Sequence, residues 1–458
     1  MPMAMQSGAA IPSEELISAR IERLPTTSWY RRIMLIMGTA GFFDAFDALA
    51  IAFVLPVLIG MWHINPAQIG GLISIGYAGQ LIGAVGFSSL AENYGRQRVL
   101  QWTIAIIGVF SLACAFAWSY QSLFVFRFIQ GLGLGAEVPI AATYMNEFSK
   151  AQNRGRLVVI FQSVFAFGVM MTALLAIWVV PHLGWNWMFI IGAIPALLAI
   201  FLRRLVPESP RWLAAQGRLG EADAIVGRIE QEVSQTSTLP SLPGSFPPII
   251  KGKAHWRDLF SGVYLSRTLT AWVIAFATSI VGYGILAWLP TIYRTIYKLP
   301  LEQTLQYSFV SYFVGLFGTL SGALLIDRFG RKVCFSISFG GAAIPLLVLW
   351  SIVGRAGAET VVAMASTSLF FISILLGAIY VYMPEIYPTR MRALGSGTAS
   401  SWMRIASIVG PLVVGLILSK SGLNSVFLFF AIVAVIGVFV VLAFAIETKG
   451  KVLEEISH

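Results

Sequence analysis

Long runs of apolar residues recur along this chain and are separated mostly by short polar loops. A helix rises about 1.5 Å per residue, so about 20 apolar residues cross the hydrocarbon core of a bilayer. The pattern predicts twelve such helices. Their expected ranges are 33–58, 68–91, 97–117, 122–147, 156–180, 185–206, 267–290, 304–327, 333–353, 359–383, 394–418 and 424–446.

The composition agrees with a chain that lies mainly in a membrane. Hydrophobic residues make up 57% of the 458 residues and charged residues only 11%, whereas soluble domains carry about 25% charged residues. Continuous apolar runs favour helices over a β-barrel, whose strands show short alternating segments. The predicted fold class is therefore an all-α membrane protein with twelve transmembrane helices.

Composition and motifs also argue against several other functions. An enzyme is not expected. The phosphate-binding motif GxxxxGK[ST] does not occur, so we do not expect an ATP-driven pump either. Cys114 and Cys334 lie in separate apolar runs and the four histidines do not cluster, so no disulfide, metal or cofactor is expected. The net charge of +10 is expected to reflect basic loops beside a membrane, and nucleic acid is not an expected partner.

Lysine and arginine positions predict the orientation, because cytoplasmic loops carry an excess of basic residues. With the N-terminus inside, almost all of the 31 basic residues fall on the cytoplasmic side. The first 32 residues contain SEELISARIERL and no signal-peptide pattern. We expect a monomer in the lipid bilayer of a bacterial inner membrane, with both termini cytoplasmic. The basic residues assigned elsewhere are Arg294, Lys298, Arg355 and Lys420 on the opposite side and Arg127 and Arg404 within spans.

The chain repeats itself, which predicts two related halves. LAENYGRQR at 90–98 corresponds to LIDRFGRKV at 325–333, and YMNEFSKAQNRGR at 144–156 to YMPEIYPTRMRALG at 382–395. Such repeats place a substrate site between two pseudo-symmetric bundles, near the membrane midplane. The expected divisions are an N-terminal segment 1–32, a six-helix bundle 33–206, a linker with short helices 207–266, a second six-helix bundle 267–446 and a tail 447–458.

These repeated loops resemble those of the major facilitator superfamily. Further motifs are similar to the branch that holds sugar porters, organic ion transporters and synaptic-vesicle glycoproteins. They are RFIQGLGLGAE, PESPRWL, EIYPTRMRALG and ETKG. Glu92 and Asn93 depart from the usual Asp-Arg pair, and SIVGYGILAWLP lacks the paired glutamines by which sugar porters hold hydroxyl groups. The resemblance therefore implies the major facilitator fold and makes a sugar substrate doubtful.

Charged residues near the ends of the repeated spans are predicted to gate the inner side. Glu147 with Arg154, and Glu385 with Arg392, are expected to form ion pairs that hold this gate shut. Alternatively, these residues only orient the helices at the interface. The full predicted gating set is Glu92, Arg96, Glu137, Glu147, Arg154, Asp327, Arg331, Glu385 and Arg392, of which Glu137 is a gate or a packing partner.

Ionisable residues inside spans are functional hypotheses by default. Counted at about 1.5 Å per residue, Asp47 and Arg127 lie at the same depth, roughly 21–22 Å from the cytoplasmic edge. We predict an Asp47–Arg127 ion pair in which Asp47 takes up a proton when the pair weakens. The resemblance supports this, because proton-coupled sugar porters carry an Asp and an Arg at these places. The alternative is a static pair, and Asp44, one turn away, is a second proton site or a substrate contact.

Arg404 lies near the midplane and offers a planar fork that suits a carboxylate. Its surroundings, SWMRIASIVGP, resemble those of the arginine in organic anion transporters; the alternative is a structural pair with an Asp of the first span. Aromatic walls around one arginine suit a flat ring that bears a carboxylate. The predicted substrate-binding residues are Arg404, Gln162, Phe165, Tyr283, Trp288 and Tyr380.

The predicted function is proton-coupled import of a small organic anion by alternating access. An aromatic monocarboxylate such as nicotinate is favoured, because the FFDAFD run at 42–47 resembles the first span of bacterial nicotinate transporters. One alternative is proton-driven efflux of drug-like or other organic cations held by Asp44 and Asp47. Another is a transporter-like sensor without turnover.

Overall fold

The computed structural model describes residues 13–25, 28–148, 154–197, 206–235, 237–242, 255–388 and 391–449, and these residues form helices and loops without a strand. Ten of the described helices are long and apolar enough to cross a membrane. The helices of the first half are α2 (Ser28–Trp62), α3 (Pro66–Tyr94), α4 (Arg96–Ala115), α5 (Tyr120–Phe148), α6 (Arg154–His182) and α7 (Asn186–Gly192). Those of the second half are α11 (Val263–Thr295), α12 (Leu301–Phe329), α13 (Arg331–Ile352), α14 (Ala358–Glu385) and α15 (Arg392–Phe444).

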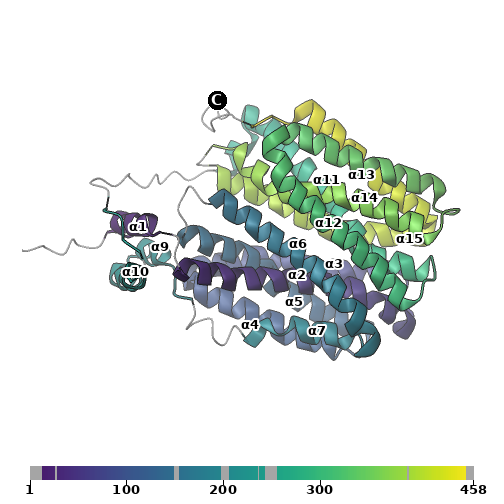
Figure 1. Cartoon of the computed structure of the whole chain (residues 1–458), viewed down its shortest axis with the longest axis horizontal. Helices are drawn as coiled ribbons and strands as arrows, with labels where there is room; N and C mark the ends of the chain where they lie inside the picture. The colour runs from purple at the N-terminus through teal and green to yellow at the C-terminus, as the bar shows by residue number, and fades with distance from the viewer. Residues whose placement is uncertain are drawn as a thin grey trace, which may run out of the picture.

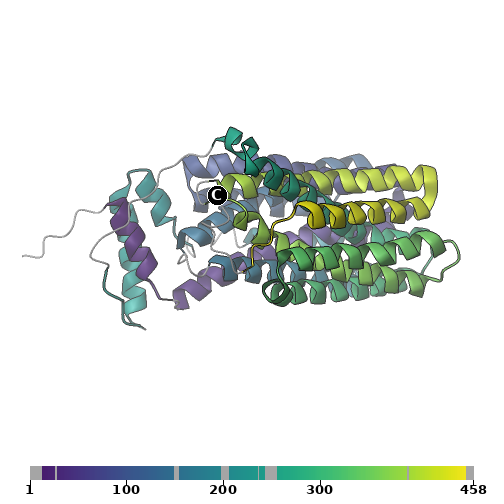
Figure 2. The ribbon, with the colours of Figure 1, turned by 90° about the horizontal axis from the view of Figure 1, so that it is seen from above.

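The twelve predicted spans are consistent with these helices once two details are considered. The helix α15 covers both of the last predicted spans, and at Gly422 its backbone leaves the helical region, with φ 77° and ψ 178°. Figure 2 shows the chain reversing its direction there. An apolar helical stretch at Asn186–Leu197 corresponds to the predicted span 185–206, whose last residues before 206 lie outside the described residues.

The two halves lie side by side with their long axes roughly parallel (Figure 1). Across their boundary α3 packs on α15, α6 on α12 and α2 on α11. The short helices α1 (Glu14–Arg23), α9 (Pro210–Ala215) and α10 (Leu219–Ser234) lie beyond one end of the bundle, called here the α10 end. The opposite end is called the far end. The fold therefore leaves one long interface between the halves, and a site can form along it.

Helices α3 and α15 pack against each other as an antiparallel ladder, and its tightest steps are near the far end. A Cβ at Gly415 would lie 2.5 Å from the Pro66 carbonyl oxygen, and one at Gly70 would lie 2.5 Å from that of Pro411. One step nearer the α10 end, the Ser74 hydroxyl donates to the Ile408 carbonyl at 2.6 Å. At Gly415 and Gly70, only glycine permits so close an approach of the two backbones.

Turns at the α10 end repeat in both halves. Gly95 and Gly330, which precede α4 and α13, have φ values of 101° and 89°, a region that favours glycine. Glu208 accepts the Arg96 and Gln97 amides at 2.9 and 3.1 Å, and so caps the start of α4. Glu447 caps α13 in the same way.

Glu447 accepts the backbone amides of Arg331 and Lys332 at 2.9 and 3.0 Å. Burial alone would raise the pKa of Glu447, but the bonds from the Lys449, Arg331 and Lys332 amides outweigh it and lower the pKa. Thus the glutamate of the PESPR motif and that of the ETKG motif have the same role in the two halves. Each accepts the free backbone amides at the start of a helix, α4 in the first half and α13 in the second.

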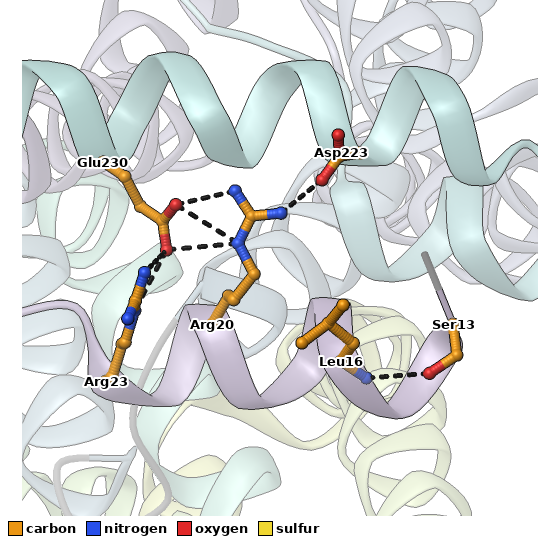
Figure 3. Close-up of polar contacts among 6 residues, drawn as sticks. All are labelled: Ser13, Leu16, Arg20, Arg23, Asp223 and Glu230. Atoms are coloured by element: carbon orange, nitrogen blue, oxygen red, sulfur yellow. Dashed lines mark hydrogen bonds and ion pairs between the residues drawn. The ribbon is translucent and has the colours of Figure 1, made fainter. Parts of the chain in front are cut away.

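The helix α1 docks on α9 and α10 through an apolar face and a cluster of ion pairs. Ile17 and Ile21 are fully buried in a small core with residues of α9 and α10. On the charged side, Arg20 and Arg23 both bind Glu230 of α10, with shortest N–O distances of 2.6 and 2.5 Å (Figure 3). This small core and its ion pairs join a segment before the first span to the segment between the halves.

Candidate functional site

A cavity lies between the two halves, about midway along them. Its empty volume, including the part open to solvent, is about 890 Å³, within the range of small-molecule sites. Both halves contribute to its walls. The lining residues are Asp44, Ala48, Tyr77, Gln80, Pro139, Phe165, Tyr283, Tyr380, Ser400, Met403, Arg404 and Ser407.

Arg404 is the basic residue of this wall. From α15 its Nη1 donates to the Gln80 side-chain oxygen at 3.4 Å, and its Nη2 donates to the Gly135 carbonyl at 3.3 Å. Both partners are neutral and belong to the first half. Arg404 is absent from the ion pairs within 4.0 Å that the described residues form, so the predicted alternative of a pair with Asp44 or Asp47 is not formed. The two long hydrogen bonds leave the guanidinium able to receive a carboxylate.

Aromatic rings line the same cavity as Arg404. The ring centroids of Tyr77 and Tyr283 are 5.9 Å apart, with an interplanar angle of 56°. Phe165 and Tyr380 complete this wall. These surfaces suit the faces and edges of a flat ring.

Two of the predicted substrate-binding residues need comment. The prediction for Trp288 was wrong: its side chain is fully buried in the core and does not line the cavity. Trp288 lies five positions after Tyr283 on α11. At about 100° per residue, the two side chains therefore leave the helix on different faces. Gln162 lies on α6, but its side chain is outside the described part of the structure.

The predicted direct ion pair between Asp47 and Arg127 was also wrong. Arg127 Nη1 donates to the backbone carbonyl of Asp47 at 3.0 Å and to the Gln130 side-chain oxygen at 2.7 Å. Gln130 in turn donates to Asp47 Oδ1 at 3.1 Å, and Ser111 donates to the same oxygen at 2.7 Å. Gln130 is three residues beyond Arg127 on α5, so it shares that helix face and connects the two charged groups.

Asp44 lies one turn before Asp47 and lines the cavity between the halves, as Arg404 does. No hydrogen bond to its carboxylate is formed by the described residues, although the side chain is buried. The cavity therefore presents one cation and one carboxylate that do not neutralise each other by direct contact.

The sequence prediction missed Tyr77, Gln80, Gln130 and Ser111. A signal for Gln130 was present, because a buried amide one turn from a buried arginine shares its helix face. Tyr77 and Gln80 are likewise three residues apart on α3. Nothing in the sequence alone shows which face of that apolar helix meets the second half.

In the described part of the structure, five of the nine predicted gating residues form ion pairs within one half or the other. In the first half Arg96 Nε lies 3.3 Å from Glu147. In the second half Arg331 pairs with Asp327 at 3.1 Å and with Glu385 at 2.7 Å. Each of these pairs joins neighbouring helices of a single half, so none of them ties the halves together directly.

The predicted Glu385–Arg392 pair is not the one that forms, because Arg331 binds Glu385 and Arg392 Nε donates to the Pro384 carbonyl at 3.1 Å. The side chain of Arg154, the predicted partner of Glu147, is outside the described part of the structure. Glu92 is exposed, and its backbone carbonyl accepts the Trp212 indole at 2.8 Å. Glu137 lies deeper, beside Asp44 and Asp47.

Comparison with known proteins places this geometry in a family. The sequence profile described as "Sugar (and other) transporter" matches residues 33–458. A niacin transporter, NiaP, of Acinetobacter baylyi is 34% identical over 447 residues, which cover 96% of this chain and 99% of that protein. Organic cation/carnitine transporter 7 of Arabidopsis thaliana is 29% identical and covers 90% of each chain.

Solved structures show the same fold. The partially occluded, inward-open conformation of the xylose transporter XylE from E. coli superposes with a TM-score of 0.75 at 20% identity, and covers 93% of this chain and all of XylE. The profile match spans most of the sequence, and the relatives match it almost end to end. The chain therefore belongs to the sugar (and other) transporter family of the major facilitator superfamily and is an integral membrane transporter.

Proposed function

We propose that this transporter is a proton-coupled symporter that imports a small organic anion, in particular an aromatic monocarboxylate such as nicotinate. The observation that carries the proposal is the state of Arg404. Its guanidinium lies in the cavity between the halves and binds two neutral oxygens at 3.3 and 3.4 Å. Charge-assisted, bidentate bonds to a carboxylate are shorter and stronger, so an organic acid displaces these contacts favourably.

The walls of the cavity support an aromatic substrate. Tyr77, Tyr283, Tyr380 and Phe165 offer ring faces and edges around the position that a carboxylate takes on Arg404. The Acinetobacter baylyi relative named a niacin transporter matches the chain from end to end, which favours a pyridine ring among the flat acids.

Proton coupling is assigned to the Asp47 cluster. Asp47 is fully buried, and among the described residues only one of its two carboxylate oxygens has hydrogen-bond partners. Arg127 acts on it through Gln130 and through the Asp47 backbone. A shift of α5 against α2 changes these contacts and therefore the balance between the charged and the protonated carboxyl.

The remaining parts of the proposal follow from the sequence. The excess of lysine and arginine in the loops of the α10 end supports a cytoplasmic location for that end and for both termini. We propose a bacterial inner membrane as the location and a monomer as the working unit. The ion pairs of Arg96 and Arg331 are proposed to keep each half rigid while the halves rock around the cavity.

Transport by purified protein in liposomes tests the proposal. With an acidic exterior, labelled nicotinate and benzoate should accumulate, and accumulation should stop when an ionophore removes the proton gradient. Arg404→Gln should weaken acid binding by about 10- to 100-fold, because a hydrogen bond to a charged group contributes about 1.5–3 kcal/mol. Arg355→Gln, which changes an exposed arginine outside the cavity, is the matched control. Unchanged acid uptake by Arg404→Gln contradicts the anion site.

Efflux of an organic cation is the second candidate, and Asp44 favours it. This carboxylate lines the same cavity without a hydrogen-bond partner among the described residues, and one relative is named an organic cation/carnitine transporter. In the same liposomes, labelled cations should then move in response to the proton gradient. Efflux is supported over acid import if Asp44→Asn abolishes this movement and Arg404→Gln retains it.

A further inference from the structure

A second cavity lies inside the first half, separate from the cavity between the halves. Its empty volume, including the part open to solvent, is about 430 Å³, and residues of α2, α4 and α5 line it together with Pro195. Three carboxylates, those of Asp44, Asp47 and Glu137, line it among apolar side chains. Asp44 is the residue shared by the two cavities.

Two oxygens in this second cavity have no hydrogen-bond partner among the described residues. They are Oδ2 of Asp47 and Oε1 of Glu137, and both are buried. The Glu137 side chain is 4% exposed and forms no ion pair among the described residues. A buried ionised carboxylate without a partner is very costly. These oxygens are therefore suited to carry a proton rather than a lasting negative charge.

The charges around Glu137 come from three helices. From α2 the carboxylates of Asp44 and Asp47 face it. On α5, the helix of Glu137, Arg127 donates to the Asp47 carbonyl and to the Gln130 side chain. From α15, Arg404 donates to the carbonyl of Gly135, two residues before Glu137. The α4 side of the cavity is apolar, formed by Leu100, Ile104 and Ile107.

The second cavity extends from Asp47 toward the α10 end. Its wall includes Ile36 of α2, eleven residues before Asp47, which corresponds to about 16 Å along the helix. It also includes Leu100, in the first turns of α4. The path that these residues mark bypasses Arg404 and the tyrosines of the cavity between the halves.

We propose that Glu137 is a proton carrier and that protons pass between Asp47 and the α10 end through the second cavity, apart from the substrate route. The inference rests on the proposed proton coupling at Asp47. One proton leaves the Asp47 carboxyl, is taken up by the Glu137 carboxylate, and is released from there to the aqueous phase at the α10 end. Asp44, which faces both cavities, connects this path to substrate occupancy.

Glu137→Gln in proteoliposomes tests the inference through two rates. Accumulation of labelled nicotinate driven by a pH gradient should fall by at least about tenfold, because the carrier cannot take up a proton. Counterflow exchange of nicotinate at equal pH on both sides should remain, because it needs no net proton movement. Glu137→Asp should restore part of the accumulation. If both rates fall together, Glu137 is a packing or gating residue and the inference is wrong.

Filling the cavity gives a second, independent measurement. Ala40→Leu narrows the second cavity and should slow accumulation while sparing exchange; Gly38→Leu, where an added Cβ meets nothing within 4 Å, is its control. Equal accumulation by Ala40→Leu and the parent contradicts the route. If the parent protein accumulates no aromatic acid under a pH gradient, the proposed function fails. If the parent does accumulate it, and Glu137→Gln and Ala40→Leu accumulate it equally well, only the inference fails.

Discussion

At the scale of single residues, a neutral amide organises the charged centre of the first half. Gln130 accepts from Arg127 at 2.7 Å and donates to Asp47 Oδ1 at 3.1 Å, so it holds the two charges in one network without direct contact between them. Its amide group therefore sets how strongly Arg127 acts on Asp47. Buried networks of this kind are strong when every member is satisfied and weak when one is lost.

Gln130→Leu should break this network. It removes the partner of Arg127 and of Asp47 in a buried place, so we expect a loss of about 2–3 kcal/mol in unfolding free energy. A drop in the thermal unfolding midpoint of the purified protein measures it. Gln121→Leu, at an exposed position of α5, should leave the midpoint nearly unchanged. A Gln130→Leu protein as stable as the parent means that the network does not bear on the fold.

Tyr283 should contribute through its ring rather than its hydroxyl. Tyr283→Ala should weaken nicotinate binding by roughly tenfold, because aromatic pairs contribute about 0.5–1.5 kcal/mol beyond burial of their area. Tyr283→Phe keeps the ring and should bind almost as the parent does. Titration calorimetry with the purified protein measures both variants. Equal losses in the two variants would instead assign the effect to the hydroxyl.

The residue types of the site were predictable and their contacts were not. Depth counted along a helix placed Asp47 and Arg127 at one level, but depth does not show rotation about the helix axis. Gln130 therefore came between them unseen. The same uncertainty explains why Trp288 was assigned to the cavity and Tyr77 and Gln80 were not. Among the predicted residues that the structure describes, Phe165, Tyr283, Tyr380 and Arg404 do line the cavity.

At the scale of elements, the apolar runs predicted the spans well, because a bilayer permits only helices of sufficient length there. Observed helices extend a few residues beyond the predicted ranges; α3, for example, begins at Pro66 with an Asn65 capping box. The docking of α1 on α10 was not predicted, because amphipathic periodicity shows that a helix has an apolar face but not what covers it.

The docking of α1 should depend on Glu230. Burial alone would raise its pKa, but hydrogen bonds and charges from Arg20 and Arg23 outweigh burial and lower the pKa below about 4.5. A lowered pKa in the folded state means that the stabilisation is complete above about pH 4.5 and is lost as the pH falls further. Amide hydrogen exchange of Glu14–Arg23 should therefore accelerate below this pH.

Glu230→Gln should accelerate the same exchange at pH 7. Glu232→Gln is the matched control, because Glu232 pairs with Arg32 at 3.3 Å in an exposed place, where ion pairs contribute little. If both variants exchange at equal rates, the charged cluster does not hold α1, and the apolar contacts of Ile17 and Ile21 suffice.

At the scale of the whole molecule, the two halves meet along the α3–α15 ladder. At Gly415 and Gly70, near the far end, the backbones leave no room for a Cβ, whereas beside the cavity the two helices are joined through side chains, where Arg404 reaches Gln80 at 3.4 Å. The repeated loops predicted two halves and a site between them. They did not predict that the ion pairs at the α10 end stay within each half, because matching motifs show equivalence and not contact.

A larger side chain at the tight steps should open the far end. Gly415→Leu places atoms against the Pro66 carbonyl, so the halves must separate there. Labelling of Ser400→Cys in the cavity, with Cys114 and Cys334 changed to alanine, should then rise for a membrane-impermeant reagent added at the far end and fall for one added at the α10 end. Gly60→Leu, where an added Cβ meets nothing within 4 Å, is the control. Labelling that is the same in both variants contradicts this account of the interface.

The second cavity has a consequence for how such transporters diversify. Asp47, Gln130 and Glu137 all belong to the first half, whereas Arg404, Tyr283 and Tyr380 belong to the second. The proposed proton-coupling groups thus lie in one stretch of the gene, whereas the cavity wall is divided between both, since Tyr77, Gln80 and Phe165 belong to the first half. A chimera joined between α10 and α11, with its second half taken from a relative of different substrate, should still be driven by a pH gradient, and its substrate preference should shift toward that of the relative. Recombination between duplicated copies then offers a direct route to new cargo without rebuilding the energy coupling.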